Sequence, residues 1–311
     1  MKNTLIVIAG PTASGKTKLS IEVAKHFNGQ IVSADSMQIY KGMDIGTAKA
    51  SKVEQAEVPH HMIDIVDPAE NYSASRYVQD ASTICDSLLS KNIIPIVVGG
   101  TGLYIDSLIA GRNFGAYEDP AVRKSLEEQY NQIGGAKMLK ELAVFDPQRA
   151  EALHPADKKR IIRAFEVYML SGETITAHDI RTKTLPPKYN SLFIIPGYHN
   201  RETLYSAIND RVDKMYQLGL FDEVRVLLES GVPEYATSMQ AIGYKEVIPA
   251  LNGYISDNYA LDMIKQSSRR YAKRQLTWFS KKTSALRIFH EDYSSFDETI
   301  NTALSFLEAN L

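Results

Sequence analysis

The hydrophobic positions of the chain form two kinds of run: short continuous ones and longer ones with helical spacing. Leu5–Ala9 and Ile93–Val98 are continuous apolar runs, which is typical of strands buried on both faces of a parallel sheet. Lys18–Phe27 and Ser73–Leu89 have apolar residues every three or four positions, as in helices packed on one side. Strands that alternate with helices predict an α/β fold built on a parallel sheet.

The pattern changes after about residue 115. Residues 119–178 have only helical spacing, rich in acidic and basic residues, and strand-like spacing returns at Ser191–Pro196. We therefore expect an α/β core made of residues 1–115 and 190–311, including the C-terminal helices. A helical domain of residues 116–189 is predicted to interrupt it.

A phosphate-binding motif stands between the first predicted strand and helix. The segment matches G-x-x-x-x-G-K-[ST], and its residues are Gly10, Pro11, Thr12, Ala13, Ser14, Gly15, Lys16 and Thr17. Glycines let backbone N–H groups turn toward a phosphate, Lys16 adds a positive charge, and Thr17 offers a hydroxyl to Mg²⁺. The sequence thus predicts a P-loop NTPase-like core that binds a nucleotide or diphosphate with Mg²⁺.

The acidic residue expected of a P-loop kinase is missing from its usual place. The strand at Ile93–Val98 is followed by Gly-Gly-Thr-Gly instead of an acid. Asp35 follows the second predicted strand, Gln30–Ala34, and should lie beside the P-loop. Asp35 is a candidate general base, with a helix cap or a water-mediated metal contact as alternatives. Thr101 is a candidate donor to the same phosphates or a turn-stabilising hydroxyl.

Composition limits the class of protein further. The formal net charge is only -2, so a nucleic-acid surface must come from local clusters such as Lys159, Arg160 and Arg163. Cys85 is the single cysteine, which excludes an internal disulfide and fits a reducing compartment. The apolar start of the chain is too short to span a membrane. We expect a cytoplasmic protein that does not bind membranes.

Seven sequence blocks together resemble the bacterial tRNA dimethylallyltransferase (isopentenyltransferase) family. The blocks occur in the family's order, cover nearly the whole chain, and are GPTASGKT (10–17), DSMQIY with KGMDIGTAK (35–49), HHMIDIVDP (60–68), VGGTGLY (98–104), HPADKKRIIRAFEV (154–167), AIGYKE (241–246) and YAKRQLTWF (271–279). The resemblance implies transfer of a prenyl group from dimethylallyl diphosphate to the exocyclic amine of an adenosine beside the anticodon of tRNA. It also implies that the P-loop and Mg²⁺ hold the diphosphate.

The resemblance assigns roles to individual residues as well. Asp35 is similar to the base that removes a proton from the amine, and Thr101 and Arg123 resemble substrate-contacting residues near the reaction centre. Four groups of residues resemble tRNA contacts. They are Asp35, Ser36, Met37 and Gln38; Lys159, Arg160, Ile161, Ile162 and Arg163, in the helical insertion; Gln240, Ala241, Ile242, Gly243, Tyr244 and Lys245; and Lys273, Arg274 and Gln275. The partners expected are the tRNA anticodon stem-loop and dimethylallyl diphosphate, with the protein acting as a monomer.

Three other functions stay open on the sequence alone. A nucleotide or small-molecule kinase would use the same P-loop but would turn over ATP. A prenyltransferase acting on a free adenine nucleotide would not need the basic helical insertion. An RNA-binding protein without activity would not need Lys16, Thr17 and Asp35 together.

Overall fold

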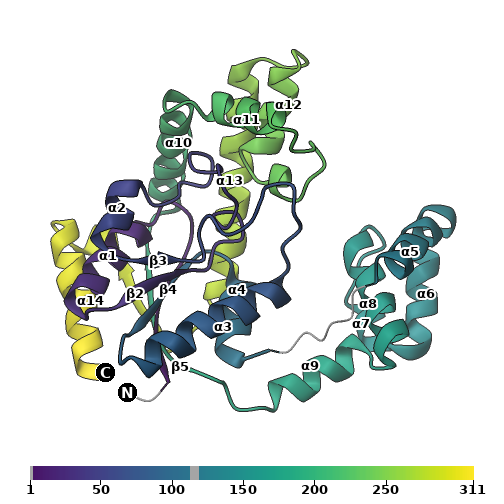
Figure 1. The fold of residues 1–311 in the computed structure, drawn as a ribbon, viewed down its shortest axis with the longest axis horizontal. Coiled ribbons are helices and arrows are strands. Elements are labelled where there is room, and N and C mark those ends of the chain that lie inside the picture. The colour runs from purple at the N-terminus through teal and green to yellow at the C-terminus, as the bar shows by residue number, and fades with distance from the viewer. Residues whose placement is uncertain (1–2, 113–118) are drawn as a thin grey trace. The chain divides into compact units, whose positions relative to one another are not determined.

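The computed structural model describes residues 3–112 and 119–311. The chain divides into two compact units, which we call the core unit, Met1–Gly111 with Lys188–Leu311, and the helical unit, Arg112–Pro187. Figure 1 shows the elements of both units. The boundary predicted after residue 115 lies outside the described residues.

The core unit is built on a six-stranded parallel sheet with the order β3-β2-β4-β1-β5-β6. The strands are β1 (Thr4–Ala9), β2 (Gln30–Ser33), β3 (His60–His61), β4 (Pro95–Gly99), β5 (Asn190–Gly197) and β6 (Leu286–Phe289). In the register of the central strands, Val7 of β1 aligns with Val97 of β4 and Phe193 of β5. The predicted α/β class and parallel sheet are confirmed.

Helices cover both faces of this sheet. The β1-to-β2 and β3-to-β4 connections run in opposite directions along the sheet, so right-handed crossovers place α1 (Lys16–His26) and α3 (Ala74–Ser90) on opposite faces. The apolar side chains packed under α1 and α14 (Phe296–Asn310) include Leu19, Val23, Ala303, Leu307, Ile6, Ile8 and Ile96. On the other face Tyr77 of α3 stacks on Tyr104 of α4 (Gly102–Ala110), with ring centroids 4.0 Å apart.

Further helices of the core unit follow β2 and β5. They are α2 (Lys52–Glu57), α10 (Arg201–Gln217), α11 (Leu220–Glu229), α12 (Tyr244–Leu251) and α13 (Asp257–Phe279), with short 3₁₀ turns at Ser238–Gln240 and His290–Asp292. Helix α13 packs against both α10 and α12, and the three stand beyond the sheet in Figure 1. Their position matters because α10 and α13 bring side chains to the ends of the strands.

The described residues of the helical unit form α5 (Pro120–Ile133), α6 (Gly135–Phe145), α7 (Pro147–Glu151), α8 (Lys158–Ser171) and α9 (Ile175–Lys183). Its own core contains Leu126, Met138, Leu142, Ile161 and Ile162. Asp119 caps α5 by accepting from the N–H groups of Ala121 and Val122, and Asp146 caps α7. The unit therefore has an independent hydrophobic core.

Several elements differ from the sequence pattern, β3 and β6 most of all, and β4 begins at Pro95 instead of the predicted Ile93. The strand β3 has only two residues, both histidines, and it forms because its backbone pairs with β2 while His61 hydrogen-bonds Gln30 across the pair. The edge strand β6 is four residues long and pairs only with β5 among the described residues. Neither has the continuous apolar run of the central strands. Helix α1 begins at Lys16, two residues before the predicted start.

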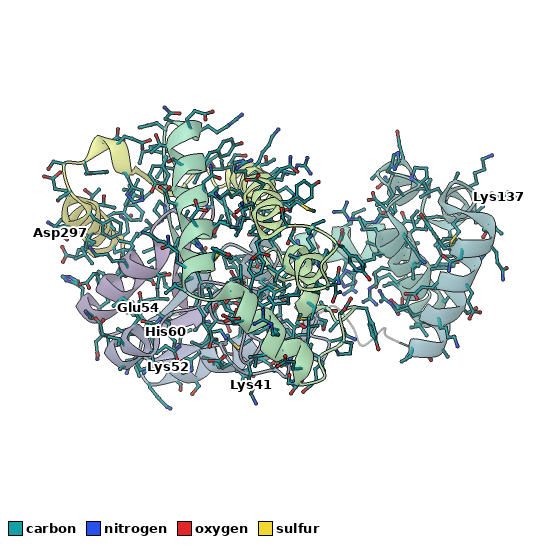
Figure 2. All side chains as sticks on the ribbon, turned by 90° about the horizontal axis from the view of Figure 1, so that it is seen from above. Lys41, Lys52, Glu54, His60, Lys137 and Asp297 are labelled. Carbon is teal, nitrogen blue, oxygen red and sulfur yellow. The ribbon has the colours of Figure 1, made fainter. Side chains whose placement is uncertain are left out.

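Charged side chains lie on the surface of both units. Charged side chains labelled in Figure 2, such as Lys52, Lys137 and Asp297, are exposed. Cys85 of α3, in contrast, is fully buried, and burial raises the pKa of its thiol to about 12. Across the described residues, we find no helix with the length and apolar character needed to cross a membrane.

Candidate active site

The P-loop connects β1 to α1 at the carboxyl edge of the sheet. Gly15 caps the helix with a φ of 74°, a left-handed conformation that side chains rarely adopt. A Cβ at this position would also lie 2.9 Å from the ring of Phe296. Lys16 and Thr17 consequently occupy the first turn of α1, where backbone N–H groups lack helical partners and attract anions.

Hydrogen bonds hold the loop in shape. The Ser14 hydroxyl and the Lys16 ammonium both donate to the carbonyl of Pro11, at 2.8 and 2.6 Å. The N–H of Thr12 donates to Oε1 of Gln275 at 2.9 Å, and Nε2 of Gln275 donates to the carbonyl of Gly100 at 3.1 Å. A single buried side chain of α13 thus joins the P-loop to the loop after β4.

A cavity of about 340 Å³, which we call the phosphate cavity, opens over this loop. Its lining includes Thr12, Ala13, Ser14, Gly15, Lys16, Thr17, Gln38, Gly99, Gly100 and Gln275. Backbone amides and a lysine dominate this set. The phosphate cavity is therefore suited to an anionic group.

A second cavity of about 300 Å³, the acceptor cavity, adjoins the first. The two share the lining residues Thr12, Asp35, Thr47, Arg211 and Tyr271. Away from this junction, the acceptor cavity has apolar side chains from α10 and α13, namely Ile208, Val212, Met215 and Ile264. Its volume is at the small end for ligand sites, and it suits one flat ring system better than a larger ligand.

Asp35 lies at the junction of the two cavities. It follows β2 in a turn in which its Oδ1 accepts from the N–H of Met37 at 2.9 Å. The N–H of Ser36 is held by the hydroxyl oxygen of Thr101 at 3.1 Å. Thr101 thus braces the Asp35 turn from the start of α4, which is the turn-stabilising alternative considered for it. Its contact with substrate stays a prediction.

Two cations face Asp35 in this junction. Burial, followed by repulsion from Arg211, lowers the pKa of Lys16 to about 7, and attraction to Asp35 opposes this shift. Burial also lowers the pKa of Arg211, again opposed by Asp35. Asp35 is the one carboxylate shared by the two cavities, and a bound anion would further stabilise the charged forms of Lys16 and Arg211. Burial and the Asp35 carboxylate raise the pKa of Tyr271 to about 12, so this phenol stays protonated near neutral pH.

Arg211 was missed in the sequence, although a signal was present. Helix α10 buries Leu204, Ile208, Val212 and Met215 along one stripe. Arg211 comes three residues after Ile208 and four before Met215, so it lies beside that stripe on the same face of the helix. A charged residue on the buried face of a helix needs a partner or a functional reason.

The residues predicted to contact tRNA fall into different environments. Asp35, Ser36, Met37, Gln240, Ala241, Ile242, Lys245 and Arg274 line the acceptor cavity, and Gln38 lines the phosphate cavity. Lys273, Lys159 and Arg160 are exposed. Gln275 and Tyr244 have side chains engaged inside the protein, and Gly243 is buried at the start of α12. The predicted tRNA contacts of the core unit and α8 therefore include residues in a cavity wall, residues on the exposed surface, and buried residues behind the cavity.

The predicted site residues of the helical unit are likewise divided. Ile161 and Ile162 are buried in the core of that unit, so their side chains support α8 and do not present a surface. Arg163 donates to the buried carboxylate of Glu166 at 2.8 Å, and Arg123 lies 3.7 Å from the same carboxylate. Arg123 belongs to the helical unit, and its place in the reaction stays a prediction.

The described residues hold no group of three or more His, Cys, Asp or Glu side chains arranged to bind a metal ion. Mg²⁺ does not need such a group, because it keeps several waters and commonly binds one or two protein oxygens plus phosphate oxygens. Thr17, in the first turn of α1 and in the wall of the phosphate cavity, offers one such oxygen. The Thr17 hydroxyl, completed by phosphate oxygens and waters, would fit Mg²⁺ bound together with a diphosphate.

Comparison with known proteins decides among the alternatives. The family model described as IPP transferase matches residues 38–282, and a model for isopentenyl transferase matches residues 3–63. The chain belongs to the IPP transferase family. Its relatives include the tRNA dimethylallyltransferases of Caldanaerobacter subterraneus subsp. tengcongensis and of Acetivibrio thermocellus. They are 43% and 44% identical, and each alignment covers 99% of this chain and 98% of the relative.

Solved structures agree with this membership in the IPP transferase family. The full-length tRNA isopentenylpyrophosphate transferase from Bacillus halodurans has a TM-score of 0.73 and 40% identity, covering 99% of this chain and 96% of its own. A eukaryotic dimethylallyltransferase solved acting on tRNA has a TM-score of 0.82 and 28% identity, covering 99% of this chain and 80% of its own. The P-loop-like fold is thus shared across the family.

The tether made by Gln275 leads to a first prediction. Gln275→Leu removes the acceptor of the Thr12 N–H and the donor to the Gly100 carbonyl, and each buried unsatisfied group costs about 1–3 kcal/mol. We expect a lower melting temperature and weaker binding of inorganic pyrophosphate, measured by calorimetry. Lys273→Gln, an exposed change on the same helix, is the control. Equal pyrophosphate affinity in both variants would contradict the role of Gln275.

Proposed function

We propose that this protein transfers the dimethylallyl group of dimethylallyl diphosphate to the exocyclic N6 amine of an adenosine next to the anticodon in tRNA, releasing diphosphate. The observation that carries the proposal is the pair of adjoining cavities that meet at Asp35. One is lined by phosphate-binding groups and the other by apolar side chains. The names of the relatives, tRNA dimethylallyltransferases, support the same reaction.

The phosphate cavity holds the donor in this proposal. Lys16 and Arg211 lie where negative charge grows on the departing diphosphate as its bond to the allylic carbon breaks. Fixed charges aimed at such a group stabilise the transition state more than the ground state. Bound Mg²⁺, held by Thr17 and the diphosphate oxygens, would add positive charge at the same place.

Asp35 acts as the general base. The lone pair of an adenine amine is delocalised into the ring, so attack on carbon is helped by removing a proton as the new N–C bond forms. One oxygen of Asp35 is held by the Met37 N–H, and the other accepts no hydrogen bond from the described part of the chain, so it is available to accept that proton. The neutral phenol of Tyr271 lines the same junction.

The acceptor is a base taken out of an RNA loop. The acceptor cavity of about 300 Å³ is sized for one ring system and not for a folded RNA. Anticodon loops are a favourable source, because their bases are unpaired and unstack at low cost. We assign the rest of the RNA to exposed basic residues, including Lys273 of the core unit and Lys159 and Arg160 of the helical unit.

We propose that the enzyme works in the cytoplasm as a monomer. A tRNA substrate and a single free cysteine support the cytoplasmic location.

A label-transfer assay tests the function directly. Purified protein, Mg²⁺ and labelled dimethylallyl diphosphate are offered unmodified tRNA or AMP, with ATP hydrolysis measured in parallel. We expect label in tRNA alone. Label in AMP alone would show that the acceptor is a free nucleotide. ATP turnover without prenyl transfer would show that the protein is a kinase.

Asp35→Asn keeps the oxygen that accepts from the Met37 N–H but removes the basic carboxylate. We expect kcat for transfer to fall by about 10²–10⁴-fold, while tRNA affinity changes little. Pyrophosphate affinity should not fall, because the neutral amide removes a negative charge beside Lys16 and Arg211. The matched control is Asp67→Asn, because exposed Asp67 accepts from the Ala69 N–H in the same kind of turn. Normal kcat at saturation, combined with lost tRNA binding, would show that Asp35 only binds.

Removing the exposed charges of Lys159 and Arg160 tests the RNA surface. Each lost phosphate contact reduces the slope of log K against log salt by about 0.7 for single-stranded RNA. The double alanine variant should therefore bind tRNA more weakly and with a slope shallower by about 1.4. Lys137 and Lys140 are exposed on α6 of the same unit and provide the control pair. An unchanged slope would assign α8 a purely structural role.

A further inference from the structure

Two segments of the core unit contribute to the acceptor cavity wall. Gly46 and Thr47 come from the loop between Tyr40 and Ser51, which we call the wall loop. Gln240, Ala241 and Ile242 come from the turn before α12, and Lys245 from the first turn of α12. Neither stretch is fixed by strand pairing, so the shape of the cavity depends on side-chain contacts behind it.

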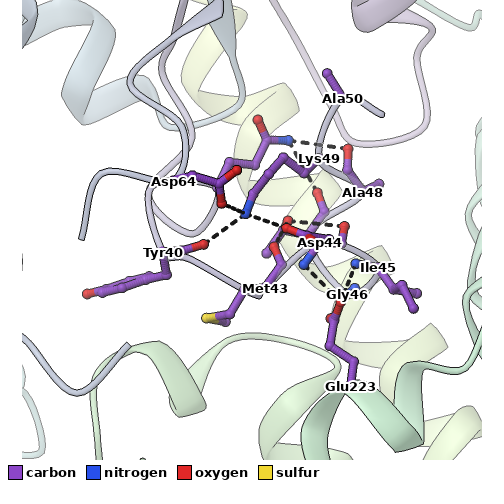
Figure 3. A network of polar contacts seen from close by, with 12 residues as sticks. Tyr40, Met43, Asp44, Ile45, Gly46, Ala48, Lys49, Ala50, Asp64 and Glu223 are labelled. Atoms are coloured by element: carbon purple, nitrogen blue, oxygen red, sulfur yellow. Dashed lines mark hydrogen bonds and ion pairs between the residues drawn. The ribbon is translucent and has the colours of Figure 1, made fainter. Parts of the chain in front are cut away.

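The carboxylate of Glu223, on α11, joins these two segments. Its Oε2 accepts from the N–H groups of Asp44 and Ile45 at 2.9 and 2.7 Å, and its Oε1 accepts from that of Gly46 at 3.1 Å. Oε1 also accepts from the hydroxyl of Tyr244 at 2.5 Å. Figure 3 shows Glu223 pointing into the wall loop at Ile45 and Gly46. Three successive backbone N–H groups form an anion-binding nest, which the protein fills with its own carboxylate.

The two segments also touch directly at this point. A Cβ on Gly46 would lie 2.4 Å from Cε2 of Tyr244, so only glycine allows this approach. Loss of the Glu223 carboxylate would leave the buried Tyr244 hydroxyl and three N–H groups without their acceptor. Glu223 thus supports the junction of the walls from outside the cavity.

Lys49 fixes the other end of the wall loop. Its side chain is only 2% exposed and donates to the Tyr40 carbonyl and to Asp44 and Asp64 at 2.8, 2.6 and 2.6 Å. Figure 3 shows this ammonium surrounded by the three acceptors. Between the two anchors lies Thr47, whose carbonyl accepts from Gln38 at 3.3 Å and Arg211 at 3.5 Å. The wall loop therefore lines both cavities. Glu223 hydrogen-bonds residues 44–46 of this loop, of which Gly46 lines the acceptor cavity.

We propose that Glu223 is a positioning residue that sets the shape of the acceptor cavity and thereby the affinity for the RNA acceptor, while leaving the diphosphate site intact. The proposal rests on the proposed function for the identity of the acceptor. It follows from the side-chain hydrogen bonds of Glu223, which among the described residues go to the wall loop and Tyr244. The P-loop is held separately, through Gln275.

The test uses Glu223→Gln, which keeps the shape but presents an NH₂ group to one part of the nest. We expect the KM for an anticodon stem-loop RNA to rise about tenfold, as for the loss of a charge-assisted hydrogen bond. The KM for dimethylallyl diphosphate should stay within about twofold, since the contacts of Gln275 are untouched. Amide hydrogen exchange at residues 44–46 should become faster. Glu229→Gln, an exposed change at the end of α11, is the control.

A purely structural role for Glu223 would raise both KM values together or lower activity only through a smaller folded fraction. Either result, or unchanged exchange at residues 44–46, would overturn the proposal. If Glu223→Gln does not fold, Tyr244→Phe removes one of the four hydrogen bonds and should produce the same selective change at smaller size. Absence of transfer by the unaltered protein would reject the proposed function instead, and the exchange measurement would still test the positioning.

Discussion

Burial of two basic side chains around one carboxylate is the constraint on which the active site depends. Lys16 and Arg211 come from helices far apart in the sequence, and burial lowers the pKa of each, with repulsion from Arg211 adding to the shift of Lys16. Attraction to Asp35 opposes both shifts. A bound anion would stabilise the charged forms of both side chains, and this attraction is stronger in a site shielded from water. In the proposed reaction, the departing diphosphate is that anion.

The supporting structure keeps these groups fixed. Gln275 joins the P-loop to the loop after β4, and Thr101 holds the turn that carries Asp35. Glu223 and Lys49 secure the loop that contributes Thr47 to both cavities. Each of these four polar side chains makes at least one hydrogen bond to a backbone group of a loop, which is how irregular segments attain the rigidity that catalysis needs.

The central strands, the P-loop and the Asp35 turn were predictable because their signals are local. Continuous apolar runs identify β1 and β4, and the glycine-lysine motif needs only eight adjacent residues. Long-range contacts left weaker signals. Arg211 lies beside a buried stripe on α10, yet only the fold shows that it is near Lys16. Gln275 is predicted to contact tRNA from its sequence block, and only the fold shows that its side chain hydrogen-bonds the P-loop. Strands β3 and β6 form through pairing and lack a pattern of their own.

The most direct test of this account is a crystal structure with inorganic pyrophosphate, Mg²⁺ and an anticodon stem-loop RNA. The account predicts the diphosphate against the P-loop in contact with Lys16 and Arg211. It also predicts an unstacked adenine in the acceptor cavity, with its amine within about 3.2 Å of Asp35. A diphosphate bound away from Arg211, or an adenine that remains stacked in the RNA outside the cavity, would contradict it.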